Sequence, residues 1–139
     1  MSSTGGTFSD SDHAEVIAAL RDTVLRGGLR RLFRQVDGMV VTPADDAASS
    51  ASVPEVFIGT RSVTFSLPGT SARDVERRLL AANMDEPPPR KSFGHCTYEL
   101  DGDPTAGELV DLALRGLRAL GARPLNGRWN FAVRKSAGA

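Results

Sequence analysis

Hydrophobic residues recur along this chain with a helical period in three places. The first stripe lies within residues 12–27 and comprises Val16, Ile17, Leu20 and Val24. A polar cap at Ser71 begins a second helix, which we predict over residues 71–83. Thr105 and Glu108 have the spacing of a capping box and predict a third helix through residue 120. Because large apolar residues are frequent along this third helix, we expect it to lie centrally across a sheet.

Elsewhere the pattern alternates between apolar and polar residues, as is typical of strands with one buried face. The predicted strands cover residues 39–42, 56–58, 63–67, 93–100 and 128–134. Gly59 and Thr60 provide the turn of a hairpin between the second and third of these. In the strand over 93–100, alternate residues face opposite ways. One side carries Cys96, Tyr98 and Leu100, and the other carries His95, Thr97 and Glu99.

Five further segments are ambiguous or lack a pattern of buried and exposed positions. Residues 29–36 fit either a short helix, which we favour, or a strand. Residues 43–54 are small and polar and predict a mobile surface loop, while the prolines within 85–91 predict an extended, polyproline-like connector. The two ends, 1–11 and 136–139, read as disordered tails. A single domain over residues 12–135 remains.

The predicted order of elements defines an α+β fold. Strands that follow one another along the chain favour an antiparallel sheet, here of about four to five strands. Two or three helices then pack mainly on one face of that sheet. A chain of 139 residues is the right length for one such domain.

The composition of the chain bears on its binding partners and on its cellular compartment. The chain has 17 basic and 17 acidic residues, so its net charge favours neither nucleic acid nor an acidic membrane surface. Only Lys91 and Lys135 are lysines, and this excess of arginine indicates a GC-rich, bacterial coding sequence. A single cysteine, the absence of a signal-peptide pattern and the absence of a long apolar run predict a cytoplasmic protein without a membrane span.

No motif for catalysis, metal or cofactor stands out. His95 and Cys96 are neighbours, but on a strand they point to opposite faces, so a thiolate–imidazole pair is not expected. Cys96 fits a small core residue better. Two histidines and one cysteine do not supply a zinc site, and no glycine pattern matches a phosphate-binding loop. We therefore predict no catalytic residue, no metal and no cofactor.

Two sets of residues are candidates for binding. If the polar side of the strand over 93–100 is left uncovered, it offers a binding surface made of Arg61, His95, Thr97 and Glu99. Two arginine-rich segments, the second with aromatic residues interleaved, offer a nucleic-acid surface instead. Its candidate residues are Arg30, Arg31, Arg34, Arg128 and Arg134.

The stretch over 54–122 resembles small bacterial α+β domains of the MmcQ/YjbR-like kind and the luciferase-domain proteins. The shared features are the hairpin over 54–65, the acidic-proline segment at 85–87, and a closing helix after the Asp103–Pro104 turn. A similar layout occurs in CesT/YbjN-type peptide-binding chaperones. The resemblance implies a compact α+β domain that binds something, and the chaperone likeness implies protein partners.

Three functions follow in order of expectation. The first is a non-enzymatic binding or accessory module that recognises a protein or peptide, with a homodimer formed by sheet-edge pairing left open. The second is a nucleic-acid-binding domain that uses the arginine-rich segments. The third is a small-molecule binder or enzyme with a pocket near His95.

Overall fold

The structure is a computed structural model. It describes residues 5–22, 37–43, 53–67, 69–82, 90–92, 95–100, 102, 104–122, 124 and 127–135. The elements, in chain order, are β1 (Gly5–Ser9), α1 (Ala14–Asp22), β2 (Asp37–Pro43), β3 (Glu55–Ile58), β4 (Ser62–Ser66), α2 (Ala72–Ala81), β5 (Arg90–Ser92), β6 (His95–Glu99), α3 (Ala106–Ala119) and β7 (Arg128–Lys135).

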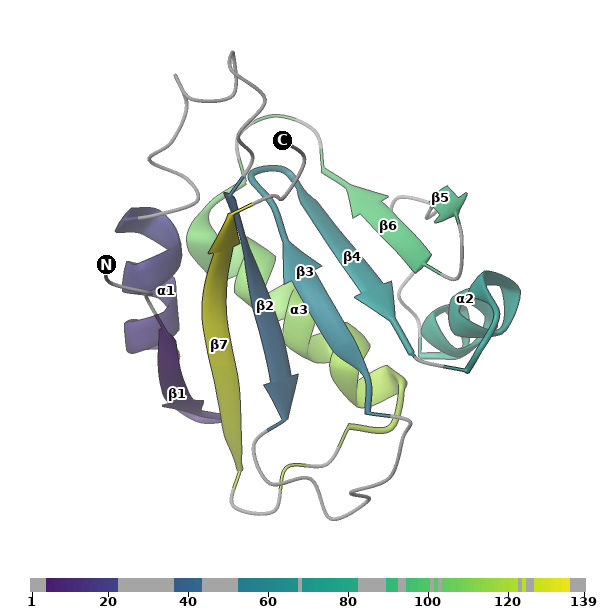
Figure 1. Cartoon of the computed structure of the whole chain (residues 1–139), viewed down its shortest axis with the longest axis horizontal. Coiled ribbons are helices and arrows are strands. Elements are labelled where there is room, and N and C mark those ends of the chain that lie inside the picture. The colour runs from purple at the N-terminus through teal and green to yellow at the C-terminus, as the bar shows by residue number, and fades with distance from the viewer. Residues whose placement is uncertain are drawn as a thin grey trace.

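All the strands belong to one sheet, with the order β1-β7-β2-β3-β4-β6-β5 and only antiparallel neighbours (Figure 1). The predicted α+β class and antiparallel sheet are confirmed. The sheet is larger than predicted, with seven strands in place of four to five. The two additional strands, β1 and β5, lie at its opposite edges.

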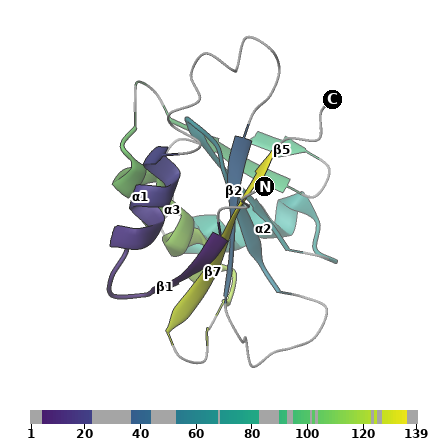
Figure 2. The same cartoon turned by 60° about the vertical axis from the view of Figure 1, so that its left-hand side comes forward.

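The helices pack on one face of the sheet. Buried residues of α1, α2 and α3 join a single core with the inward residues of the strands, among them Val16, Leu79 and Leu117 from the helices. Helix α3 lies behind the central strands in Figure 1, and Figure 2 shows α1 and α3 on the same side of the sheet. The central position predicted for the third helix is therefore confirmed.

The caps read from the sequence begin the helices as expected. The Ser71 hydroxyl accepts a hydrogen bond from the Asp74 amide at 3.2 Å, and α2 starts at the next residue after Ser71. Thr105 and Glu108 form a complete capping box, with reciprocal bonds of 3.1 and 3.0 Å. Each bond satisfies a backbone or side-chain group that the first turn of a helix otherwise leaves unpaired.

The contact between α3 and the sheet depends on a glycine. A methyl group at Gly116 would lie 2.2 Å from the Phe65 ring, so only a residue without a side chain lets the ring approach the helix. The ring also makes an edge-to-face contact with Tyr98, with ring centroids 5.9 Å apart. These residues are buried, which places the centre of the core between α3, β4 and β6.

The prediction of a disordered tail over residues 1–11 is wrong for residues 5–9. They form β1, which pairs with β7 from Gly5–Ala132 to Ser9–Arg128. Phe8 is 2% exposed and belongs to the core. A partner strand that lies more than a hundred residues away supplies the order that the local pattern lacked. The domain accordingly begins before residue 12.

The boundaries near β5 and β6 also differ from the prediction. The sequence predicts that residues 90 and 91 belong to the connector and that the following strand begins at Phe93. Instead Arg90–Ser92 pairs antiparallel with His95–Glu99, so a short hairpin replaces a single strand. Extended connectors and strands share similar backbone angles, and pairing with β6 decides between them.

The remaining boundary predictions fall outside the described residues. They are the helix or strand over 29–36, most of the loop over 43–54, the connector over 85–89 and the C-terminal tail over 136–139.

Candidate binding surface

The sheet has a second face, opposite the helices, that we call the open face. Among the described residues, no helix packs against it. It is formed by the strand residues that alternate with the core residues, and their side chains range from partly to fully exposed. The reason is the alternation itself, since every second side chain of a strand must face away from the core.

A row of five residues crosses the middle of this face. The strand register places Ala132, Val40, Phe57, Thr64 and Thr97 side by side on β7, β2, β3, β4 and β6. The row spans about 19 Å at a strand spacing of about 4.8 Å. All five side chains are partly exposed. Its first three members are apolar and its last two carry hydroxyl groups, so the row has an apolar half and a polar half.

The apolar half contains a side chain that lies over a glycine. A methyl group at Gly38 would lie 1.9 Å from Cζ of Phe57, so the ring covers the backbone of β2 at that residue. An aromatic ring laid across a cross-strand glycine shields the backbone from water. The ring nevertheless keeps part of its surface exposed. Phe57 therefore offers a partly exposed aromatic contact that lies over β2.

The polar half is held by a hydrogen bond between two strands. The Oγ1 atoms of Thr64 and Thr97 are 2.9 Å apart, and either hydroxyl is able to donate. Thr97 was predicted to lie on a polar strand face together with His95 and Glu99. The structure places these residues as expected, with His95 and Glu99 exposed and Thr97 partly exposed between them.

Arg61 does not join His95 in one site. It lies in the turn before β4, where its carbonyl accepts a bond of 2.8 Å from the Leu100 amide. His95 lies at the other end of β6, since it pairs with Ser66 while Glu99 pairs with Ser62. The strand between them is about 13 Å long. The predicted set therefore extends along an edge region of the open face and does not surround a small ligand.

Cys96 and His95 face opposite sides of the sheet, as the strand period requires. The Cys96 thiol is buried and donates a hydrogen bond to the carbonyl of Ala72 at 3.1 Å. The thiol thus links β6 to the first turn of α2, which fits its prediction as a core residue. Within the part of the chain that the structure describes, no group of three or more His, Cys, Asp or Glu residues is arranged to hold a metal ion.

The arginines of the nucleic-acid hypothesis lie only partly within the described residues. Arg30, Arg31 and Arg34 fall outside them, and so does the side chain of Arg134. Arg128 is exposed at the open face and donates a hydrogen bond of 2.8 Å to the hydroxyl of Thr7. Of the open-face strand side chains that the structure describes, Arg128 is outnumbered by two carboxylates, Glu55 and Glu99.

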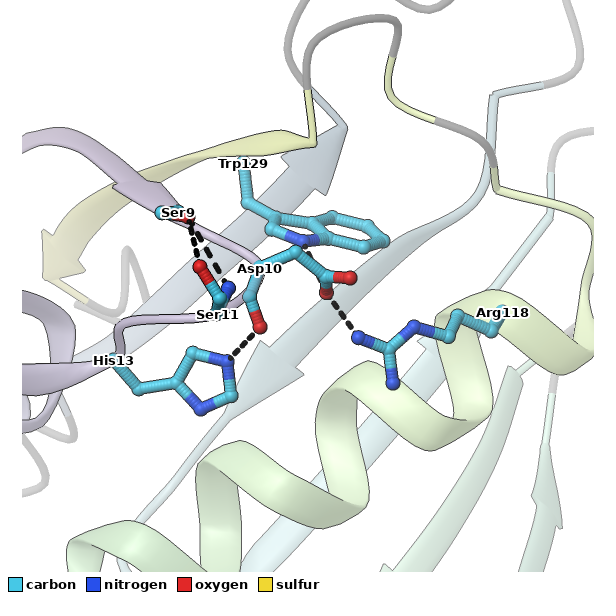
Figure 3. A network of polar contacts seen from close by, with 6 residues as sticks. All are labelled: Ser9, Asp10, Ser11, His13, Arg118 and Trp129. Carbon is cyan, nitrogen blue, oxygen red and sulfur yellow. Dashed lines mark hydrogen bonds and ion pairs between the residues drawn. The ribbon is translucent and has the colours of Figure 1, made fainter.

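A polar network attaches β1 to the rest of the fold (Figure 3). The Asp10 carboxylate accepts a hydrogen bond from the Trp129 indole at 3.1 Å and forms an ion pair with Arg118 of α3. The Asp10 carbonyl is 2.9 Å from Nε2 of His13. Trp129 is fully buried, so Asp10 satisfies the one polar atom of its side chain. The network could not be read from the sequence, because Asp10 is separated from Arg118 and Trp129 by more than a hundred residues.

Sequence analysis also missed the apolar half of the row. The signal was present, because the strand alternation that assigns Met39 and Val41 to the core assigns Val40 to the other face. The same holds for Phe57 between Val56 and Ile58. What the sequence lacked was the strand order, which brings Val40 and Phe57 together as neighbours.

Comparison of the chain with models of protein families, with curated proteins and with solved structures gave no match. The resemblance to MmcQ/YjbR-like, luciferase-domain and CesT/YbjN-type proteins therefore stays a prediction. A search of the helices in the described residues found none with the length and hydropathy that crossing a membrane requires.

Proposed function

We propose that this protein is a non-enzymatic binding module that recognises a protein or peptide partner on its open face. One observation carries the proposal. The row of Ala132, Val40, Phe57, Thr64 and Thr97 combines partly exposed apolar and hydroxyl side chains on a face that no described helix covers. Such mixed surfaces, with an aromatic residue near the centre, are typical of protein recognition sites.

The chemistry of the row defines the partner. An apolar side chain of the partner fits over Val40 and Phe57, where it removes apolar surface from water. A backbone or side-chain amide fits over the Thr64–Thr97 pair, because a hydroxyl is able both to donate and to accept. A row about 19 Å long matches an extended segment of about six residues, at about 3.3 Å for each residue.

The charges that the structure describes on the open face are compatible with a protein partner. Binding to phosphates depends on clustered cations and weakens steeply with salt. The open-face strand side chains described here include Glu55 and Glu99 against Arg128. A protein partner held by apolar contact and neutral hydrogen bonds tolerates this balance. The separation of His95 from Cys96 onto opposite faces further supports a binding role over nucleophilic catalysis.

The test selects ligands from a random peptide library on the immobilised full-length protein, and then measures affinity for variants. Val40→Lys places a charged group beside Phe57 in the apolar half of the row, and we expect the affinity of the selected peptides to fall at least about tenfold. Ala18→Lys is the matched control, since Ala18 is exposed on α1 and the same charge is added on the other side of the sheet.

Equal affinity of both variants for the selected peptides would contradict the proposal, because the ligands would then bind elsewhere. Selection of no peptide at all would also count against it. A single-stranded DNA oligonucleotide is measured in parallel at low and high salt. Tight, salt-sensitive binding of that oligonucleotide, unchanged by Val40→Lys, would instead support the arginine-rich segments as a nucleic-acid surface.

A further inference from the structure

Among the described residues, the strands of the sheet supply no partner for the backbone groups on the outer edge of β1. The Asp10 amide donates to the Gly127 carbonyl at 2.7 Å, which fixes the phase of the ladder between β1 and β7. Hydrogen-bonded and non-hydrogen-bonded pairs alternate in an antiparallel ladder. Phe8 and Gly6 therefore direct their backbone groups toward β7, while Gly5, Thr7 and Ser9 direct theirs toward the outside.

One of these outward residues, Ser9, already has a backbone partner. The Ser9 carbonyl accepts a bond of 3.1 Å from the Asp12 amide, and the two residues form a β-bridge. This contact confirms the phase, because it lies on the side of β1 away from β7. It also blocks further pairing opposite Ser9. The usable edge is therefore centred on Gly6, with the N–H and C=O groups of Gly5 and Thr7 on either side.

The two edge strands of the sheet differ in charge. The opposite edge, β5, contains Arg90 and Lys91, whereas β1 has the sequence Gly-Gly-Thr-Phe-Ser with neither charge nor proline. Charged residues and proline are the usual protection of an edge strand against pairing with another chain. Two copies of one edge carry charges of the same sign, so a positively charged edge repels its own copy and an uncharged edge does not.

We propose that two copies of this chain pair through the outer edges of β1, antiparallel and about a two-fold axis at Gly6. Gly5 of each copy then faces Thr7 of the other, and each such pair exchanges its N–H···O bonds. Gly6 faces its own copy in a non-hydrogen-bonded pair, the type with the closer backbone approach, and it has no side chain to obstruct this. The proposal does not depend on peptide binding.

This arrangement has a consequence for the open face. Directly opposite residues of antiparallel strands lie on the same face of a sheet. The two open faces are therefore on the same side of one continuous sheet, and the two rows described above are related by the two-fold axis. A partner with two suitable segments binds such a dimer with higher apparent affinity than it binds one copy.

The experiment is sedimentation equilibrium of the full-length protein over a range of concentrations. We expect a reversible monomer–dimer equilibrium, since an edge contact of this size is in the class of weak interfaces. Thr7→Pro removes the outward N–H without removing a bond to β7, as prolines at sheet edges do. It should raise the dimer dissociation constant at least about tenfold. Thr7→Val is the matched control, which keeps the N–H and loses only the hydroxyl bonded to Arg128.

A second variant covers the case in which proline unfolds β1. Thr7→Lys keeps the backbone groups but places like charges near the axis, so dimerisation should weaken at low salt and recover at high salt. Fluorescence of Trp129, the single tryptophan, reports whether β1 remains in place, because the indole contacts Asp10. A wild-type protein that is monomeric at every concentration overturns the proposal, and so does a dimer that Thr7→Pro and Thr7→Lys leave unchanged.

Discussion

The two faces of the sheet each carry a phenylalanine that lies against a glycine, but the two rings have different surroundings. Phe65 and Phe57 lie on adjacent strands of one hairpin, and each ring rests on a glycine. Phe65 faces the helices, is fully buried and contacts Gly116 of α3. Phe57 faces the other way, is partly exposed and lies over Gly38 of β2. The difference between them is what surrounds the ring, which is protein in one case and partly water in the other.

This comparison indicates that the helix-covered face contributes most of the stability, whereas residues of the open face are less constrained. A ring enclosed by α3, β4 and β6 cannot move without disturbing several neighbours, so the helix-covered face sets the free energy of unfolding. A ring with one side in water is free to shift, and a substitution there costs less. The open face is therefore able to carry a recognition surface without weakening the core. Paired substitutions on the two faces test this division.

The largest effect is expected from truncating the two rings. Phe65→Ala should lower the free energy of unfolding by about 3–5 kcal/mol, because it leaves a cavity between α3 and the sheet. Phe57→Ala should cost about 1 kcal/mol, because part of its ring is already in contact with water. Urea unfolding followed by Trp129 fluorescence measures both values. Equal losses would mean that the open face is covered as well and would contradict the comparison.

The two glycines provide a finer test of the same idea. A methyl group at Gly116 would lie 2.2 Å from Phe65, and the enclosed ring has no room to retreat. Gly116→Ala should therefore destabilise the protein by about 2 kcal/mol, although alanine favours a helix over glycine by about 1 kcal/mol. The methyl group of Gly38→Ala would meet Phe57, whose ring is able to swing toward water.

For Gly38→Ala we expect the free energy of unfolding to change by no more than about 1 kcal/mol. Moving the Phe57 ring costs free energy, but alanine is more favourable than glycine within a strand, and the two effects partly cancel. The same urea unfolding experiment compares the two variants under identical conditions. A larger loss for Gly38→Ala than for Gly116→Ala would reverse the assignment of the rigid and the adaptable face.

The sequence predicted the elements whose signals are local. The capping residues Ser71 and Thr105 placed the starts of α2 and α3, because a cap and its amide lie within one turn of each other. The alternation over β4 assigned Val63 and Phe65 to the core, as the structure confirms. The α+β class followed from the order of these elements alone.

Elements that depend on distant partners could not be predicted in the same way. Residues 5–9 contain one large apolar residue, Phe8, and their strand exists because β7 pairs with them and Asp10 meets Trp129 and Arg118. The candidate surface shows the same limit. His95, Thr97 and Glu99 were found because they alternate on one strand, whereas their relation to Val40 and Phe57 depends on the order of the strands.

The smallest effect is expected at the polar half of the open face. Thr64→Val keeps the shape and the branched side chain but removes the hydroxyl that lies 2.9 Å from that of Thr97. The remaining Thr97 hydroxyl is partly exposed and is able to bond water, so the free energy of unfolding should fall by less than about 1 kcal/mol. A double-mutant cycle with Thr97→Val isolates the coupling, which should be about 0.2–1 kcal/mol. A loss of several kcal/mol would require that both hydroxyls be shielded from water. The open face would then be buried, so it would not differ from the helix-covered face and would not be accessible to a binding partner.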